Sequence, residues 1–205
     1  ALQFGSQFGG MMNYLIKNGD STRPFVLESE QTAGSNNFFN SYNAVGGTVG
    51  KINYYAYFNQ RQGDGWRPNA AFVYQAYYAG LTYNFSSKGN IALQFSRMSY
   101  RQQIAGGLDD AQFAQNSKQS FRSRNFFNPE INIPALLFNY AFSSNTQLSV
   151  TSHYLGGQRN SVQFINTPNI MDTINTALGT YNPRQVDRDY YSGFTTEARL
   201  LHRYT

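Results

Sequence analysis

The sequence contains no cysteine, only two histidines and a low share of charged residues. The missing cysteine fits a protein exposed to an oxidising compartment such as the periplasm, where a stray thiol would form unwanted disulfides. No His-Glu-x-x-His, Cys-x-x-Cys or Gly-x-Ser-x-Gly pattern is present, so common motifs of metalloenzymes and serine hydrolases are missing. His153 with Ser149 is the nearest approach to a catalytic pair, and we expect a protein that is not an enzyme.

Long apolar runs are also missing: no stretch of about 18 apolar residues occurs, which excludes a transmembrane helix. Charged residues make up 13% of the chain, roughly half of the ~25% that is usual in soluble domains. Aromatic residues make up 17%, with 16 Tyr and 17 Phe, and the mean hydropathy is −0.52. Such a composition is typical of a transmembrane β-barrel, in which lipid-facing and lumen-facing residues alternate.

The charge balance is basic, with 16 Lys and Arg against 11 Asp and Glu, for a net charge of +5. These basic residues are scattered and form no stripe, so nucleic acid is not an expected partner. The chain opens at Ala1 without the basic and apolar regions of a signal peptide. Because an outer-membrane protein needs such a signal, we interpret the sequence as a piece of a longer protein.

Alternation of apolar and polar residues with a period of two is the main pattern, and it predicts β-strands. Ile52, Tyr54, Ala56 and Phe58, for example, share one face of an expected strand. Each expected strand is close to or longer than the ~9–11 residues that a tilted strand needs to cross a membrane. About eight antiparallel strands are expected, over residues 24–33, 37–47, 51–62, 71–86, 90–104, 131–143, 146–158 and 190–205.

The connections between these strands alternate in length. Short polar breaks at 46–51, 86–90 and 143–146 alternate with longer ones at 63–69, 105–130 and 160–189. Short turns on one side and long loops on the other are typical of outer-membrane barrels, which have periplasmic turns and extracellular loops. The sequence therefore predicts an all-β protein, a transmembrane antiparallel β-barrel.

Three stretches carry recognisable motifs. Residues 4–17 read Phe-Gly-Ser-Gln-Phe-Gly-Gly-Met-Met-Asn-Tyr-Leu-Ile-Lys, residues 55–67 contain Tyr-Phe-Asn-Gln-Arg-Gln-Gly-Asp-Gly-Trp-Arg, and residues 106–113 read Gly-Gly-Leu-Asp-Asp-Ala-Gln-Phe. The first is similar to the end of the plug domain of TonB-dependent outer-membrane transporters. The other two resemble a barrel strand and extracellular loops of the ferric dicitrate (siderophore) receptor type within that family.

The resemblance divides the chain into two parts. Residues 1–20 would be the C-terminal end of a plug domain. Residues 21–205 would be the first eight or so strands of a roughly 22-stranded barrel. It also implies a bacterial outer-membrane location and uptake of a ferric chelate, such as ferric citrate, driven by the TonB–ExbB–ExbD complex. Outer-membrane lipid and lipopolysaccharide would surround the barrel, and a partner lipoprotein is a further expectation. The resemblance implies no cofactor, because the ferric chelate is the transported ligand.

Arginines near the predicted loops are the candidate ligand-binding residues, because a planar guanidinium fork suits the carboxylates of an anionic chelate. Arg159 is prominent among them, because it follows a predicted strand end. The alternative is that these arginines contact acidic loop neighbours or lipopolysaccharide phosphates. The residues assigned to ligand binding are Arg159, Arg184, Arg188, Arg122, Arg124 and Gln103.

Contacts between plug and barrel are expected at Gly9, Gly10 and Asn13 on the plug side and at Glu197 and Arg199 on the barrel side. For the last two the alternative is an ion-pair ladder along the lumen.

Two functional alternatives stay open. The first is a TonB-dependent transporter of another cargo, such as cobalamin, an oligosaccharide or a peptide. The second is a small, complete eight-stranded barrel with a structural or adhesive function.

Overall fold

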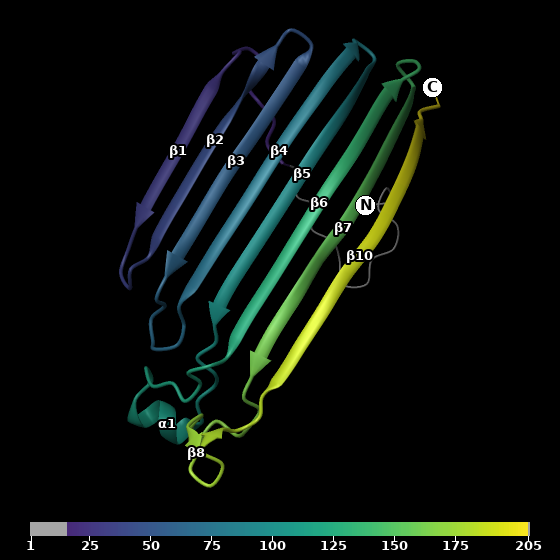
Figure 1. The fold of residues 1–205 in the computed structure, drawn as a ribbon. Coiled ribbons are helices and arrows are strands. Elements are labelled where there is room, and N and C mark those ends of the chain that lie inside the picture. Colours follow the sequence, from purple (N-terminus) through teal and green to yellow (C-terminus); the bar gives the residue numbers. More distant parts are fainter. Residues whose placement is uncertain (1–15, 205) are drawn as a thin grey trace.

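The computed structural model describes residues 16–204 and forms one antiparallel sheet of eight strands in sequence order (Figure 1). Two smaller strands and one short helix lie in the long connections. The sheet strands are β1 (Val26–Ala33), β2 (Phe39–Val49), β3 (Ile52–Gly63), β4 (Phe72–Ser86), β5 (Gly89–Gln103), β6 (Phe126–Ala141), β7 (Thr146–Gln163) and β10 (Gln185–His202). The other elements are α1 (Asp110–Gln115), β8 (Ile174–Asn175) and β9 (Thr180–Tyr181).

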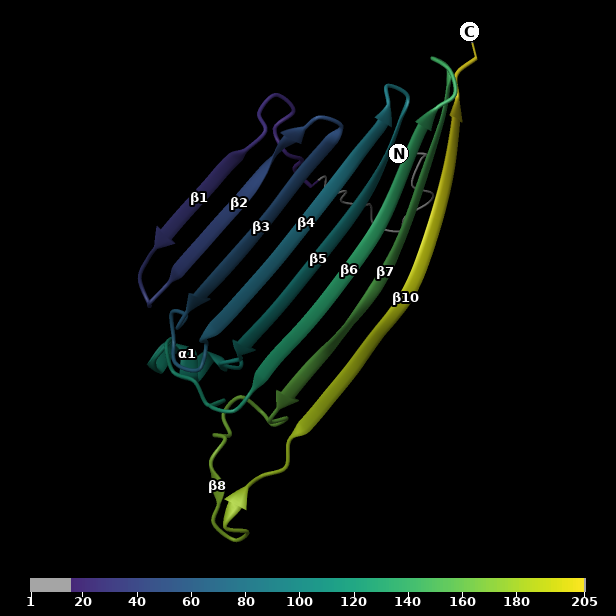
Figure 2. The same cartoon turned by 45° about the horizontal axis from the view of Figure 1, so that its top comes forward.

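The strands lengthen along the sheet, from 8 residues in β1 to 18 residues in β7 and β10. They are joined at one end by tight turns such as Gly50–Lys51, where Gly50 has a φ of +58° that favours glycine. At the other end lie the longer connections, and there α1 and the β8–β9 hairpin extend beyond the sheet (Figure 2). The end with these connections is called the loop end below.

Strict alternation gives the sheet two faces of different chemistry. The apolar face carries Ile52, Tyr54, Ala56 and Phe58 of β3 together with their in-register neighbours, such as Leu81 of β4. Its side chains are exposed although they are apolar: Leu93 is 59%, Leu200 67% and Phe194 73% accessible. An exposed apolar surface of this extent indicates a face that meets another apolar phase or partner.

Charge is missing from a broad band of this apolar face. On β5 the band runs from Gly89 to Phe95, and no Asp, Glu, Lys or Arg occupies the apolar face at these levels on any described strand. The first charged residue on β5 is Arg97, eight residues beyond Gly89. This region is called the charge-free band below.

The opposite, polar face is rich in tyrosine and asparagine. Tyr55 and Tyr78 are only 4% and 3% accessible, and they pack with Ala44, Tyr42 and Tyr57. The hydroxyls of Tyr42 and Tyr55 lie 2.6 Å apart and share a hydrogen bond, which satisfies both polar groups in this crowded environment.

The segment before β1 crosses the polar face of β2 and β3. The Asn53 side chain binds the backbone of Gly19 through two hydrogen bonds: it accepts from the N–H at 3.1 Å and donates to the carbonyl at 2.8 Å. The Thr48 hydroxyl donates to the Asp20 carbonyl at 2.7 Å. A Cβ on Gly19 would lie 2.1 Å from the Tyr54 carbonyl, so glycine permits the close approach. Hydrogen bonds from the Thr22 hydroxyl and backbone hold the pKa of Asp20 below its usual value and fix the turn into β1.

The structure confirms the all-β class and the antiparallel order of the eight strands. Three strands extend further into the loops than expected, because β6 begins at Phe126, β7 ends at Gln163 and β10 begins at Gln185. Arg159 therefore lies within β7, and its expected place after a strand end was wrong. No helix in the described part of the chain has the length and apolar character needed to span a membrane.

The sheet is open over residues 16–204, because β1 and β10 occupy opposite edges and are not paired with each other. These eight strands therefore do not form a small closed barrel in this structure.

Candidate ligand-binding site at the loop end

Arg122 binds the two longest loops together. It is 5% accessible and donates to the carbonyls of Ile170 at 2.6 Å and of Asn166 and Thr167 at 2.9 Å. Its guanidinium also lies 5.1 Å from the centre of the Phe164 ring. A planar guanidinium offers several donors in fixed directions, so this one arginine supplies hydrogen bonds to three carbonyls of the other loop.

Arg184 and Arg124 join the same cluster. Arg184 forms an ion pair with Asp172 in which both side chains are almost fully buried, and its guanidinium lies 5.9 Å from the rings of Phe164 and Tyr181. Arg124 stacks on the Tyr181 ring at 3.9 Å. Three of the arginines expected to bind ligand are thus brought together, and each is engaged by loop groups. We call residues 104–125 and 164–184, joined in this way, the loop clamp.

The helix α1 is fastened to the second half of the loop clamp. Asp109 caps α1 by accepting the Gln112 N–H at 2.8 Å, and the Gln112 side chain accepts the Asp109 N–H at 3.0 Å. The Gln112 side chain also donates to the Pro168 carbonyl at 3.1 Å. The stretch 106–113 that carried the family resemblance therefore forms the capped start of this helix.

Gln103 ties the loop clamp to the connection between β3 and β4. Its amide nitrogen donates to the Ser123 carbonyl at 2.6 Å and to the Asn69 side chain at 3.2 Å. Arg67 from the same connection donates to the Gly106 carbonyl. Three loops are thereby connected, and Gln103 supports their shape.

Arg159 projects from the polar face near the loop end, where it forms an ion pair with Asp189 across β7 and β10. Both partners are accessible, at 45% and 40%, so water and solutes reach this pair. Screening by solvent makes such a pair weak and exchangeable, and an incoming carboxylate can compete with Asp189 for the guanidinium.

Arg61, Tyr74 and Tyr100 share this level of the polar face, and sequence reasoning missed them. The Arg61 guanidinium lies 5.6 Å from the Tyr74 ring, and the Tyr74 and Tyr100 rings meet edge to face at 6.3 Å. Register places Arg61 opposite Tyr74 and Tyr74 opposite Tyr100. Period-two alternation from Tyr55 and Tyr57 would have assigned Arg61 to this face, but the pairing with Tyr74 needs the register.

Arg188 does not lie beside Arg159 on one face, although both were assigned to ligand binding. Arg159 pairs with Asp189, and Arg188 pairs with Asn160, so the two arginines project from opposite faces of the sheet. Arg188 lies on the side of the apolar face.

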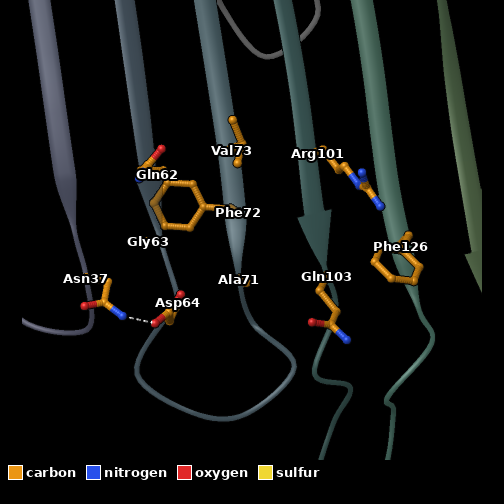
Figure 3. A pocket seen from close by; sticks show the side chains of 10 residues that line it. All are labelled: Asn37, Gln62, Gly63, Asp64, Ala71, Phe72, Val73, Arg101, Gln103 and Phe126. Atoms are coloured by element: carbon orange, nitrogen blue, oxygen red, sulfur yellow. Dashed lines mark hydrogen bonds between the residues drawn. The ribbon is translucent and has the colours of Figure 1, made fainter.

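A shallow hollow of about 380 Å³ lies at the loop ends of β3 to β6. Figure 3 shows Arg101 and Phe126 on one side of it and the hydrogen-bonded Asn37 and Asp64 on the other. The Arg101 guanidinium lies 5.6 Å from the Phe126 ring centre, and Gln103 also lines this hollow.

The expected plug contacts are described only in part. Glu197 and Arg199 lie on the polar face of β10 and form an ion pair with each other. Gly9, Gly10 and Asn13 lie outside the described residues, so the contact with the plug stays a prediction.

His153 and Ser149 both stand on the polar face, four residues apart on one strand, about 14 Å at ~3.4 Å per residue. No group of three or more His, Asp or Glu side chains in the described part of the chain could hold a metal ion.

No protein-family model matches the chain, and no curated protein matches it.

Proposed function

We propose that the chain is part of an outer-membrane β-barrel that imports an anionic ferric chelate with energy supplied through TonB. The observation that carries this proposal is the contrast between the two faces of one long antiparallel sheet. One face has an exposed charge-free band, and the other is polar and carries accessible arginine and tyrosine at the loop end.

The dimensions of the charge-free band support a membrane location. Gly89 and Arg97 are eight residues apart on β5, about 27 Å along a strand at ~3.4 Å per residue. At a tilt of about 40° this corresponds to roughly 21 Å of height, close to the ~25 Å apolar band of outer-membrane barrels. In this location, lipid would cover the apolar side chains of the charge-free band, which would otherwise be exposed to water.

The open edges of the sheet support a barrel larger than eight strands. Backbone N–H and C=O groups without partners are costly in lipid, and β1 and β10 each leave one edge unpaired in the described residues. In the proposed protein, further strands pair with both edges, as the resemblance to a roughly 22-stranded transporter implies.

The polar face supports a lumen with an internal domain. The segment around Gly19 crosses this face and is held by Asn53 and Thr48, so residues 19 and 20 lie on the side that would be the lumen. The motif over residues 4–17 resembles the end of a plug, and a plug in this position would close the lumen until the TonB–ExbB–ExbD complex acts on it.

The loop end supports an anionic cargo. Arg61 and Arg159 present accessible guanidinium groups on the polar face, with Tyr74 and Tyr100 between them. Ferric citrate and related chelates expose several carboxylates, which arginine binds with paired hydrogen bonds. The loop clamp would serve as a preorganised wall, so Arg122 and Arg184 act through loop shape in this proposal.

Calorimetry on the full-length protein tests the cargo. Ferric citrate, iron-free citrate and a ferric hydroxamate would be titrated into the wild type, Arg159→Ala, Asp189→Asn and the turn variant Lys88→Ala as a charge-matched control. We expect saturable binding of ferric citrate that weakens about tenfold in Arg159→Ala, a loss of roughly 1.4 kcal/mol. Asp189→Asn should tighten binding, because it removes the competing carboxylate, and Lys88→Ala should bind as the wild type does.

A neutral oligosaccharide is the second candidate cargo. The partly accessible rings of Tyr42 and Tyr57, whose centres lie 5.5 Å apart and which pack against the buried Tyr55 and Tyr78, offer the hydroxyl-bearing aromatic surface on which sugar rings pack. Saturable binding of an oligosaccharide with no response to any ferric chelate would replace the iron proposal with this one.

A further inference from the structure

The apolar face carries only four charged residues on the described strands, and all lie toward the loop end. They are Arg97 and Arg101 of β5, Glu130 of β6 and Arg188 of β10. The charge-free band begins directly below Arg97 on β5. We call this group of four residues the cationic strip.

Two arginines of the cationic strip keep their charge available. Arg97 and Glu130 neutralise each other in an ion pair of 3.0 Å. Arg101 and Arg188 are exposed, and no carboxylate within residues 16–204 forms an ion pair with either. Arg101 is held in place by its contact with the Phe126 ring, so its side chain loses less conformational entropy when it binds a ligand.

Neutral hydrogen-bonding groups fill the space between these two arginines. Asn128 and Asn160 face each other across β6 and β7, and Asn160 faces Arg188 across β7 and β10. A hollow of about 460 Å³ beside them is lined by Arg101, Asn128 and Asn160 among others. The side-chain oxygen of Asn128 is buried and has no hydrogen-bond partner, so it can accept a donor that the described protein residues do not supply.

We propose that the cationic strip binds the phosphorylated sugar headgroup of an outer-leaflet glycolipid whose acyl chains lie along the charge-free band. This inference rests on the proposed membrane location of the apolar face. Phosphate suits the guanidinium fork of Arg101 and Arg188, and the amides between them suit sugar hydroxyls. An amide-linked acyl chain offers an N–H donor for the Asn128 oxygen.

The spacing of the two arginines favours a headgroup with two phosphates. Arg101 and Arg188 are separated by β6 and β7, so three strand spacings of ~4.8 Å place them about 14 Å apart. A disaccharide that carries a phosphate at each end can span such a distance, whereas a phospholipid with a single phosphate contacts one arginine at a time.

The test uses the delipidated full-length protein in detergent and lipid binding by native mass spectrometry. The probes are diphosphorylated lipid A, its dephosphorylated form, phosphatidylglycerol and soluble glucosamine phosphate. The variants are Arg101→Gln, Arg188→Gln and their double variant, with Lys88→Gln in the β4–β5 turn as the charge-matched control. Each single variant should weaken lipid A binding about fivefold, corresponding to ~1 kcal/mol per basic residue at a membrane surface, and the double variant about 25-fold.

The outcomes separate this inference from the function proposed above. Lipid A that binds the wild type tightly, the double variant weakly and Lys88→Gln normally supports the cationic strip. Equal binding to wild type and double variant, equal binding of dephosphorylated lipid A, or soluble glucosamine phosphate binding as tightly as the lipid would overturn it. Reconstitution into vesicles and ferric-citrate titration of the wild type report on the barrel and its cargo independently, because the proposed cargo contacts Arg61 and Arg159 lie on the opposite, polar face.

Discussion

At the scale of single residues, the arginines of this chain divide by their partners. Arg122 is buried and donates to loop carbonyls, and the buried Arg184 forms an ion pair with Asp172. Arg159 has an exchangeable ion-pair partner, and Arg101 lies against a phenylalanine ring without an ion pair to any carboxylate in the described part of the chain. The same side chain therefore holds loops together in one place and presents free charge in another, according to burial and to the number of acceptors nearby.

Replacing Arg122 by glutamine should loosen the loop clamp without unfolding the sheet. The change removes the charged donor that hydrogen-bonds to the carbonyls of residues 166, 167 and 170, at a cost of about 2–3 kcal/mol. Amide hydrogen exchange within residues 104–125 and 164–184 should then accelerate on the order of 30- to 150-fold, while β2 to β5 keep their protection.

At the scale of a single strand, neighbouring residues experience opposite environments. Leu93 and Gln94 are adjacent on β5, but Leu93 pairs with Leu81 and Leu136 on the apolar face, and Gln94 pairs with Gly80 and Ala135 on the polar face. The period of two thus separates the apolar face from the polar face, residue by residue.

Arginine substitutions at these two positions test the orientation of β5. Leu93→Arg places a charge within the charge-free band and should destabilise the full-length protein in lipid vesicles by about 2–4 kcal/mol. Gln94→Arg adds the same side chain to the polar face and should cost much less. Urea unfolding monitored by tryptophan fluorescence measures both, and equal costs for the two variants would contradict a lipid-facing band.

At the scale of the whole molecule, the eight strands form a curved, open sheet whose two long edges are free over the described residues (Figure 2). A free edge is a template for further pairing, and an 18-residue edge such as that of β10 is long enough for extensive aggregation. Closure by further strands would satisfy these backbone groups.

In the full-length protein we therefore expect the N–H groups of β10 that do not bond to β7 to be protected from hydrogen exchange. Protection should match that of the central strand β5, because both would lie inside a continuous ladder. Exchange mass spectrometry measures this directly, with the exposed β4–β5 turn at residues 86–88 as the rapidly exchanging reference. Rapid exchange along half of the β10 amides would contradict closure.

Most of the fold could be predicted from the alternation of residues and the spacing of turns. The strands β2 to β5 fall within two residues of their expected limits, because each combines a regular pattern with a tight turn or a glycine at its end. The extensions at Phe126, Gln163 and Gln185 were missed because their sequences are polar and aromatic without a clear apolar alternation. Pairing between neighbouring strands stabilises them there despite weak local signals.

The candidate site was less predictable, because it depends on which strands face each other. The sequence alone determined the all-β class, the contrast between the two faces and the low charge that permits an apolar band, since these follow from composition and a period of two. Only the tertiary structure decided that Arg122 and Arg184 lie buried in the loop clamp, that Arg159 and Arg188 face opposite ways, and that Arg61 joins Tyr74 and Tyr100. Register between strands and contacts between distant loops set these positions, and neither is encoded in the local pattern of any single strand.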